Sequence, residues 1–297
     1  MRKILRRLFF IFIVCAVGYV FLTSIDSNTT DIEEVNLREE DLLEIYYFDV
    51  GEADSTLIRY KDYNVLIDAG NTVDGKKLSK YLKSIGVNDI DMAFVTHAHE
   101  DHMGGMQWIV YKLDVGEVYM PDHYAEWKSY ENLMNATKQE NVPIIEPEIN
   151  DEFILDDAVL KVLWIGHSED YNENSIVLRL EYKNTSYLFM ADAESDVENN
   201  ILESNIKSDV LKVGHHGSKY ASSANFLYKV KPKYAIISVG KDNEYGHPHD
   251  VVLDKLEKLN TTIYRTDLNH TIHLSSDGDN IKFDFIKTDV NGGDLGN

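Results

Sequence analysis

The chain has 297 residues and 43% hydrophobic content, which is enough to bury the core of one large domain or two small ones. Its formal net charge of -22 excludes tight electrostatic binding of duplex nucleic acid, because an acidic surface repels polyanions, although a bound cation can reverse the field at one site. The single cysteine, Cys15, excludes an internal disulfide and a multi-cysteine metal site, so any metal must be held by His, Asp and Glu side chains.

The N-terminal segment differs from the rest of the chain. The basic opening MRKILRR is followed directly by the apolar run LFFIFIVCAVGYVFLT, which as a helix nearly spans the hydrocarbon core of a bilayer. We therefore predict a signal anchor, that is, one N-terminal membrane helix, over residues 1–23, since no small-x-small cleavage pattern follows. Cationic residues favour the cytoplasmic side, so we expect a single-pass protein of the cell membrane with an extracytoplasmic catalytic domain, secreted if the segment is cleaved. A buried helix of a soluble protein is the alternative.

Three further segments follow the anchor. Residues 24–44 are acidic and polar, which predicts a solvated linker. Residues 45–287 contain the periodic apolar patterns of a folded domain, and residues 288–297 form a polar, glycine-containing tail that we expect to be flexible.

Strand and helix patterns alternate through the folded domain. Runs rich in β-branched and aromatic residues predict strands at 44–50, 55–60, 64–70, 91–96, 117–120, 153–157, 159–166, 175–182, 186–192, 234–240, 262–266 and 271–276, with a further strand leading into 209–218. Apolar residues at helical spacing predict helices at 75–86, 106–113, 125–140, 223–230 and 251–259. Two strand-rich halves, each completed by helices, predict an α/β sandwich of two sheets packed face to face with helices outside.

The stretch THAHEDHMGG, residues 96–105, places three histidines and two acids within six positions. His97 and His99 alternate just beyond a strand end and can point the same way, whereas Asp101 and His102 lie on the next turn, toward a second metal position. Zinc and manganese prefer imidazole and carboxylate ligands, and the glycine pair that follows is expected to let the backbone turn sharply into a helix. A solvated polar loop is the alternative, but it does not explain why the cluster ends an apolar strand.

Several blocks along the chain resemble one protein family. FDVGEADSTLIRY, VLIDAG, THAHEDHMGG, NSIVLRL, FMADAE, LKVGHHGS, ISVG and EYGHPH occur in the order found in the metallo-beta-lactamase superfamily, in the branch of the hydrolase domain of the competence DNA-uptake protein ComEC and its free-standing relatives. The resemblance covers residues 45–275 and implies a four-layer αββα sandwich. It also implies one or two divalent cations, for which we expect a pair of zinc ions, with manganese as the alternative.

The resemblance implies a metal-binding role for each matching position. His97 and His99 would hold the first cation, and Asp101 and His102 the second. Asp192 in MADAE would bridge both cations and orient the water that attacks. The family more often has glycine just before this aspartate, where this chain has alanine.

Three other positions complete or support this ligand set. His215 would complete the shell of the second cation, with His216 as the alternative, and Asp68 would orient the metal loop from behind. Asn174 stands where many relatives have another histidine ligand, so the first cation is held more weakly, or is manganese, and the amide is free to contact substrate. His167 is a less favoured replacement ligand.

Further residues are expected to contact the substrate. His247 in EYGHPH would bind it or protonate the leaving group, and the alternative is a loop histidine held by Pro248. Ser218 could donate a hydrogen bond to an anionic oxygen or could cap a helix. The aromatic residues Trp108, Tyr111 and Trp127 have helical spacing and are expected in the core.

Together these features predict an extracytoplasmic hydrolase that uses a metal-activated hydroxide, with Asp101, Asp192 and His247 as its catalytic residues. The ComEC-like resemblance favours a phosphodiesterase that acts on nucleic acid or on a phosphorylated envelope component. The alternatives are a carboxylic ester or amide hydrolase, acting on a lactone or lactam, and a non-catalytic, membrane-tethered accessory of DNA uptake.

Overall fold

Two β-sheets carry the fold of residues 42–287, the part of the chain that this computed structural model describes. The first sheet has eight strands in the order β15-β14-β1-β2-β3-β4-β5-β6. Its strands are β1 (Leu43–Tyr47), β2 (Thr56–Tyr60), β3 (Tyr63–Ile67), β4 (Asp89–Phe94), β5 (Asp114–Tyr119), β6 (Ile144–Ile145), β14 (Thr271–Ser276) and β15 (Ile281–Ile286). Strands β3, β4, β5 and β6 run parallel to one another, and all other neighbouring strands of this sheet are antiparallel.

The second sheet has seven strands in the order β13-β12-β11-β10-β9-β8-β7. Its strands are β7 (Glu152–Leu155), β8 (Ala158–Trp164), β9 (Val177–Tyr182), β10 (Thr185–Phe189), β11 (Val210–Lys212), β12 (Tyr234–Ile237) and β13 (Thr262–Arg265). Strands β10 to β13 run parallel to one another, whereas β7, β8, β9 and β10 pair with their neighbours in antiparallel fashion.

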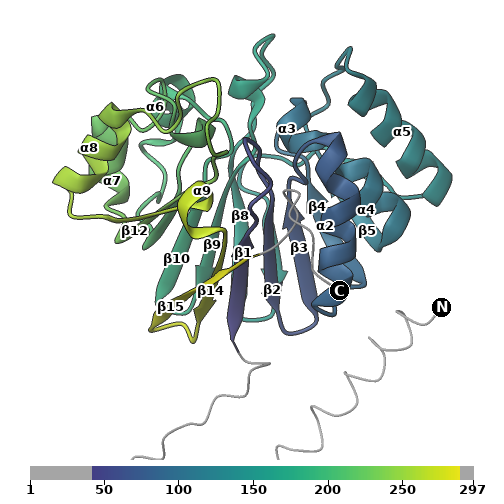
Figure 1. Ribbon diagram of the computed structural model, residues 1–297, viewed down its shortest axis with the longest axis horizontal. Coiled ribbons are helices and arrows are strands. Elements are labelled where there is room, and N and C mark those ends of the chain that lie inside the picture. The colour runs from purple at the N-terminus through teal and green to yellow at the C-terminus, as the bar shows by residue number, and fades with distance from the viewer. Residues whose placement is uncertain (1–41, 288–297) are drawn as a thin grey trace, which may run out of the picture. The chain divides into compact units, whose positions relative to one another are not determined.

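Helices cover the outer face of each sheet (Figure 1). The helices are α2 (Thr72–Ser84), α3 (Glu100–Met103), α4 (Met106–Lys112), α5 (Lys128–Glu140), α6 (Ser195–Ile201), α7 (Ala224–Val230), α8 (Asp250–Lys258) and α9 (Thr266–Asn269), with 3-10 turns η2 (Asn172–Asn174) and η3 (His215–Gly217). Helices α2 to α5 lie on the first sheet, and α6, α7 and α8 lie on the second.

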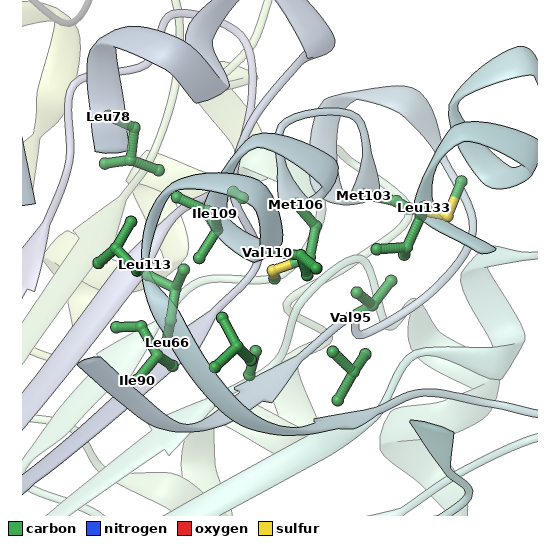
Figure 2. Packing of buried hydrophobic residues seen from close by; sticks show 14 of the residues in the cluster. Leu66, Leu78, Ile90, Val95, Met103, Met106, Ile109, Val110, Leu113 and Leu133 are labelled. Carbon is green, nitrogen blue, oxygen red and sulfur yellow. The ribbon is translucent and has the colours of Figure 1, made fainter. Parts of the chain in front are cut away.

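Three hydrophobic clusters separate these layers. In β1 the side chains of Leu43, Ile45 and Tyr47 point into the core between the sheets, whereas Tyr46 points to the helix side, as the period of a strand requires. Figure 2 shows the cluster under α2, α4 and α5, where Leu78, Met106, Ile109 and Leu133 pack on the first sheet. A matching cluster lies between the second sheet and its helices. The predicted four-layer αββα sandwich is therefore confirmed.

The predicted segment boundaries agree only in part with the structure. Strand β1 begins at Leu43, so the last residues assigned to the linker belong to the sheet. The predicted N-terminal membrane helix, most of the linker and the predicted tail lie outside the described residues. Between residues 42 and 287 no helix has the length and apolar character needed to cross a bilayer.

The parallel strands bring distant loops to one edge of the sandwich. Ile67 at the end of β3 pairs with Phe94 at the end of β4, and Phe189 at the end of β10 pairs with Lys212 at the end of β11. Because the carboxyl ends of parallel strands meet at one edge of a sheet, the loops after all four strands gather there. Those loops carry the sequence-predicted ligands.

Candidate metal centre

Asp68 fixes the histidine-rich loop of the first sheet from behind. Its buried carboxylate accepts hydrogen bonds from the backbone N–H and the hydroxyl of Thr96, at 2.8 and 2.7 Å, and lies 2.7 Å from Nδ1 of His102. This contact with Nδ1 leaves Nε2 of His102 to face the centre. Burial raises the pKa of Asp68, and the neighbouring His102 opposes that rise. Asp68 thus holds Thr96 and His102 from behind the loop.

The glycine pair after the cluster serves close packing, which differs from our expectation of a sharp turn. Both residues have ordinary helical φ angles, -54° at Gly104 and -75° at Gly105. A Cβ atom at Gly105 would lie 2.0 Å from the carbonyl oxygen of Ala69, and one at Gly75 would lie 2.4 Å from the carbonyl oxygen of Gly105. The glycines therefore let α2 and the strand end approach the loop that carries the histidines.

One group of possible ligands consists of His97, His99 and Asp192. Nε2 of His97 lies 3.0 Å from Nδ1 of His99 and 3.9 Å from Oδ2 of Asp192. His97 is fully buried, and this burial, together with the neighbouring His102, lowers its pKa well below the usual range. Burial also lowers the pKa of His99. Both imidazoles are therefore neutral at physiological pH, which is the form that binds a metal.

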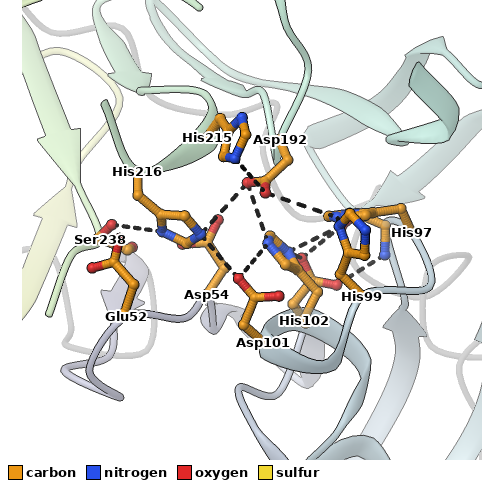
Figure 3. A network of polar contacts seen from close by, with 12 residues as sticks. Glu52, Asp54, His97, His99, Asp101, His102, Asp192, His215, His216 and Ser238 are labelled. Atoms are coloured by element: carbon orange, nitrogen blue, oxygen red, sulfur yellow. Dashed lines mark hydrogen bonds and ion pairs between the residues drawn. The ribbon is translucent and has the colours of Figure 1, made fainter. Parts of the chain in front are cut away.

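A second group consists of Asp101, His102, Asp192 and His216 (Figure 3). Oδ1 of Asp192 lies 3.2 Å from Nε2 of His102 and 3.7 Å from Nε2 of His216. Oδ2 of Asp101 lies 3.2 Å from the same nitrogen of His216. The two groups share Asp192, whose two oxygens face different sets of imidazoles, so this carboxylate has the geometry of a bridge between two cations.

His216 occupies the place for which the sequence favoured His215. Nδ1 of His216 lies 2.9 Å from the carbonyl oxygen of Ser238 at the end of β12, which turns Nε2 toward Asp101 and Asp192. His215 instead places Nδ1 2.8 Å from Oε1 of Glu194, and its Nε2 lies 3.7 Å from Oδ2 of Asp192. Both histidines have a positive φ, 48° at His215 and 51° at His216. This backbone conformation directs the buried side chain of His216 toward Asp101 and Asp192.

The charges of the centre suit divalent cations. Burial opposes the charged form of His102, but the carboxylates of Asp192, Asp68 and Asp101 outweigh it and raise the pKa of His102 well above its usual range. By the same balance, Asp192 above all raises the pKa of His216 to about 9. Despite burial, His102 and His216 hold the pKa of Asp192 well below its usual range. Without cations, protons on these histidines therefore compensate the carboxylates.

Two buried atoms show that the residues fit a metal. Nε2 of His102 and Oδ1 of Asp192 are buried 3.2 Å apart, and neither makes a hydrogen bond of normal geometry. Buried polar atoms normally find partners, and a nitrogen and an oxygen of this kind are ligands that zinc and manganese accept.

A cavity of about 300 Å³ opens over the two groups. It is lined by Glu52, His99, Glu100, Asp101, Trp127, Asp192, His215, His216, Tyr245 and His247. Across the cavity, Nδ1 of His247 lies 2.9 Å from Oε1 of Glu52, while Oε2 of Glu52 accepts a hydrogen bond from the N–H of Gly240 at 2.6 Å. Glu52 thereby orients the His247 ring and leaves its Nε2 available to the cavity.

The comparison with known proteins agrees with this arrangement. A family profile described as the metallo-beta-lactamase superfamily matches residues 48–241. The chain belongs to that superfamily. It is thus a member of a hydrolase family whose fold binds divalent metal ions, and its His and Asp groups lie where such ions would bind.

Relatives place this metallo-beta-lactamase domain near the ComEC-like proteins, as its sequence blocks indicated. ComE operon protein 3 of Bacillus subtilis (strain 168) is 32% identical over 251 residues, which is 77% of this chain and 32% of that protein. Competence protein ComA of Neisseria gonorrhoeae is 27% identical over 233 residues, which is 76% of this chain and 31% of that protein. The chain therefore spans about a third of the length of these relatives.

A solved structure supports the fold alone. The metallo-beta-lactamase fold protein YhfI from Bacillus subtilis matches with a TM-score of 0.55 and 14% identity, covering 80% of this chain and all of that one.

Several predicted site residues do not reach the metallo-beta-lactamase centre. Both ends of the Asn174 amide bind the backbone of Ser168, so this side chain closes its own loop and does not contact the cavity. Ser218 accepts a hydrogen bond from the N–H of Tyr220 and is buried in the turn after η3. The side chain of His167 is 64% exposed and lies near Glu146, outside both ligand groups.

Trp127 also differs from the prediction. It is the N-cap residue of α5, is 47% exposed and lines the cavity, whereas helical spacing placed it in the core. The helix begins at Lys128, so the helical periodicity that we extended back to residue 125 does not apply to Trp127.

Three functional candidates were missed in the sequence. Glu52 and Asp54 both lie in the block FDVGEADS, and Lys212 precedes the histidine pair in LKVGHHGS. The available signal was the presence of charged residues inside otherwise apolar blocks, in the loop between β1 and β2 and at the last position of β11. Asp54 and Lys212 form a buried ion pair at 2.8 Å.

Proposed function

We propose that the protein is a phosphodiesterase that holds two divalent cations, with zinc expected and manganese as the alternative. His97, His99 and Asp192 would hold one cation, and Asp101, His102, Asp192 and His216 the other. The observation that carries this proposal is the position of Asp192, whose two oxygens face the two groups separately. A carboxylate shared in this way supports a paired centre over a single ion.

The side chains around the cavity suggest how hydrolysis would proceed. Bound cations would supply a water acidic enough to lose its proton near neutral pH, together with positive charge opposite the phosphoryl oxygens. Asp101 and Asp192 would orient the attacking water by accepting its hydrogen bonds. His247 in its protonated form would donate from Nδ1 to Glu52 and carry on Nε2 the proton that the leaving oxygen takes.

The charge balance supports an anionic substrate only when cations are present. Asp68, Asp101 and Asp192 lie in or behind the centre, and Glu52 and Glu100 line the cavity, so a phosphodiester would be repelled until cations reverse the field. We propose nucleic acid or a phosphorylated envelope component as the substrate, without tight binding of duplex DNA, because the chain has a net charge of -22.

The substrate class is tested with the purified full chain loaded with zinc or manganese. Bis-para-nitrophenyl phosphate, a chromogenic cephalosporin and a lactone are tested in parallel as substrates. An Asp192→Ala variant prepared in the same way is the control for activity from contaminating enzymes. We expect cleavage of the phosphodiester alone. Cleavage of the cephalosporin or the lactone alone would make the protein a carboxylic amide or ester hydrolase, and turnover of none by a cation-loaded protein would leave a non-catalytic accessory.

The cellular location is a separate proposal. We propose that residues 1–23 anchor the chain in the cell membrane with the hydrolase domain outside the cytoplasm, because the basic opening precedes a long apolar run. In intact cells, protease added outside should digest the hydrolase domain but not a cytoplasmic marker. Protection of the domain until the cells are lysed would refute this orientation.

A further inference from the structure

Asp54 and Lys212 form an ion pair that joins the two sheets directly behind the centre. The Lys212 ammonium lies 2.8 Å from each carboxylate oxygen of Asp54 and also donates to the carbonyl oxygen of Val213 at 3.3 Å. Asp54 is 4% exposed and Lys212 is 3% exposed, so water does not separate the charges. Asp54 lies in the loop between β1 and β2 of the first sheet, whereas Lys212 ends β11 of the second.

The same two residues are tied to the loops that carry the metal ligands. The backbone N–H of Asp54 donates to the carbonyl oxygen of Asp101 at 3.0 Å, and its carbonyl oxygen accepts from the N–H of Gly70 at 2.9 Å. Lys212 lies just before the turn that holds His215 and His216. Figure 3 shows Asp54 between His216 and the loop of Asp101 and His102.

A contribution to stability alone does not explain why this pair is charged. Burying an ammonium and a carboxylate costs solvation energy, and well-packed apolar residues of similar volume are often as stabilising or more so. Unlike apolar contacts, the hydrogen bond that the Lys212 ammonium donates to Oδ2 of Asp54 is directional, so the pair specifies the position of one sheet edge relative to the other.

We propose that Asp54 and Lys212 are positioning residues that set the separation between the two cations by fixing the first-sheet loop of Asp101 and His102 against the second-sheet turn of His216. This inference rests on the two-cation centre proposed above. Neither residue belongs to the two ligand groups of that centre, although Asp54 lies in a third group of possible ligands with Asp68 and His102.

The test compares replacements of the pair in the full chain loaded with Mn²⁺. Lys212→Met and Asp54→Asn each leave an unpaired polar or charged group, whereas the double variant Asp54→Leu/Lys212→Met restores an apolar contact. A second double variant, Asp54→Asn/Lys212→Gln, keeps a neutral hydrogen bond. Lys161→Met, which breaks the exposed ion pair of Lys161 with Glu152 between two strands, is the matched control.

Three measurements are made on each protein: Mn²⁺ affinity and stoichiometry, the spin coupling between two bound Mn²⁺ ions by electron paramagnetic resonance, and Tm. We expect the apolar double variant to fold with a Tm close to that of the wild type. It should show no spin coupling, and its affinity for the second cation should be at least tenfold weaker. The neutral hydrogen-bonded pair should regain part of the coupling, and the control should match the wild type.

Other results would overturn the inference. Wild-type affinity and coupling in the apolar double variant would show that the pair does not position the ligands. Unfolding of both double variants would show that the pair is needed for folding and not for positioning. If the wild type binds fewer than two Mn²⁺ ions, both the inference and the proposed two-cation centre are refuted. If it binds two coupled ions but has no phosphodiesterase activity, the two-cation centre stands and only the proposed function is refuted.

Discussion

The ligand candidates of the first sheet lie on one short loop, whereas those of the second sheet come from separate loops after β10 and β11. Within residues 96–105 no residue has a positive φ, and the loop is held from behind by Asp68 and by close backbone contacts at Gly105. On the second sheet, Ala191, His215 and His216 all have positive φ angles. The ligand loop of the first sheet is thus itself relaxed, with a positive φ only at Asp68 behind it, whereas the ligand loops of the second sheet carry the strained residues themselves.

Replacing the residue that both halves share should have the largest effect. Asp192→Ala is expected to reduce turnover by at least about a thousandfold and to lose binding of both cations, because its oxygens face both groups. Elemental analysis after dialysis and a kinetic assay measure the two effects. Asp196→Ala, at an exposed position on α6, should behave as the wild type. A variant of Asp192 that keeps both cations would remove the proposed bridge.

Removing the cations should make the stability of the protein fall at high pH. The folded protein raises the pKa of His102, and that of His216 to about 9, so in the cation-free protein these protons stabilise the fold below the ordinary value of 6.5. That stabilisation is lost as the pH rises through the folded pKa, and for His216 alone it amounts to on the order of 3 kcal/mol.

Urea unfolding with a chelator should therefore give a lower free energy of unfolding at about pH 10 than at about pH 6, and the cation-loaded protein should show no such loss, since its ligands are already deprotonated. Equal pH profiles with and without chelator would contradict the proposed protonation of the empty centre.

The two adjacent histidines of the second half should differ clearly. His216→Ala is expected to weaken binding of the second cation by about a hundredfold, because His216 faces Asp101 and Asp192, whereas His215→Ala should cost about tenfold or less. Competition with a fluorescent chelator measures both affinities under one set of conditions. A larger loss in the His215 variant would restore the assignment that the sequence favoured.

Relieving strain in the second half should produce the smallest effect. Ala191 has a φ of 48°, which costs an alanine about 1 kcal/mol more than a glycine. Ala191→Gly should therefore raise Tm by a few degrees, with cation affinity unchanged. Ala98→Gly, in the relaxed loop of the first half, should lower Tm, because the added chain entropy has no strain to offset it. A lower Tm in the Ala191 variant would show that the strain is not the governing factor.

The same difference explains what the sequence could and could not predict. His97, His99, Asp101 and His102 were recognisable because their ligand spacing is local and follows an apolar strand. The two sheets and most of their strands followed from residue periodicity. His216 was not separable from His215, because the choice depends on backbone angles in η3 and on the carbonyl oxygen of Ser238.

Long-range contacts account for the other missed residues. Glu52 gains its role only when His247 and Gly240 arrive from the other end of the chain, and Asp54 only when Lys212 does. Asn174 was expected to reach substrate, yet its amide is used by the backbone of Ser168, a contact that no spacing rule reveals.

The contact between His216 and the carbonyl oxygen of Ser238 has a consequence for biosynthesis. Since the ligand set extends from His97 to His216 and is aligned by a residue at the end of β12, a growing polypeptide has only one half of the centre until that strand has left the ribosome. We therefore expect the proposed pair of cations to bind late in the maturation of this chain, after both sheets have docked.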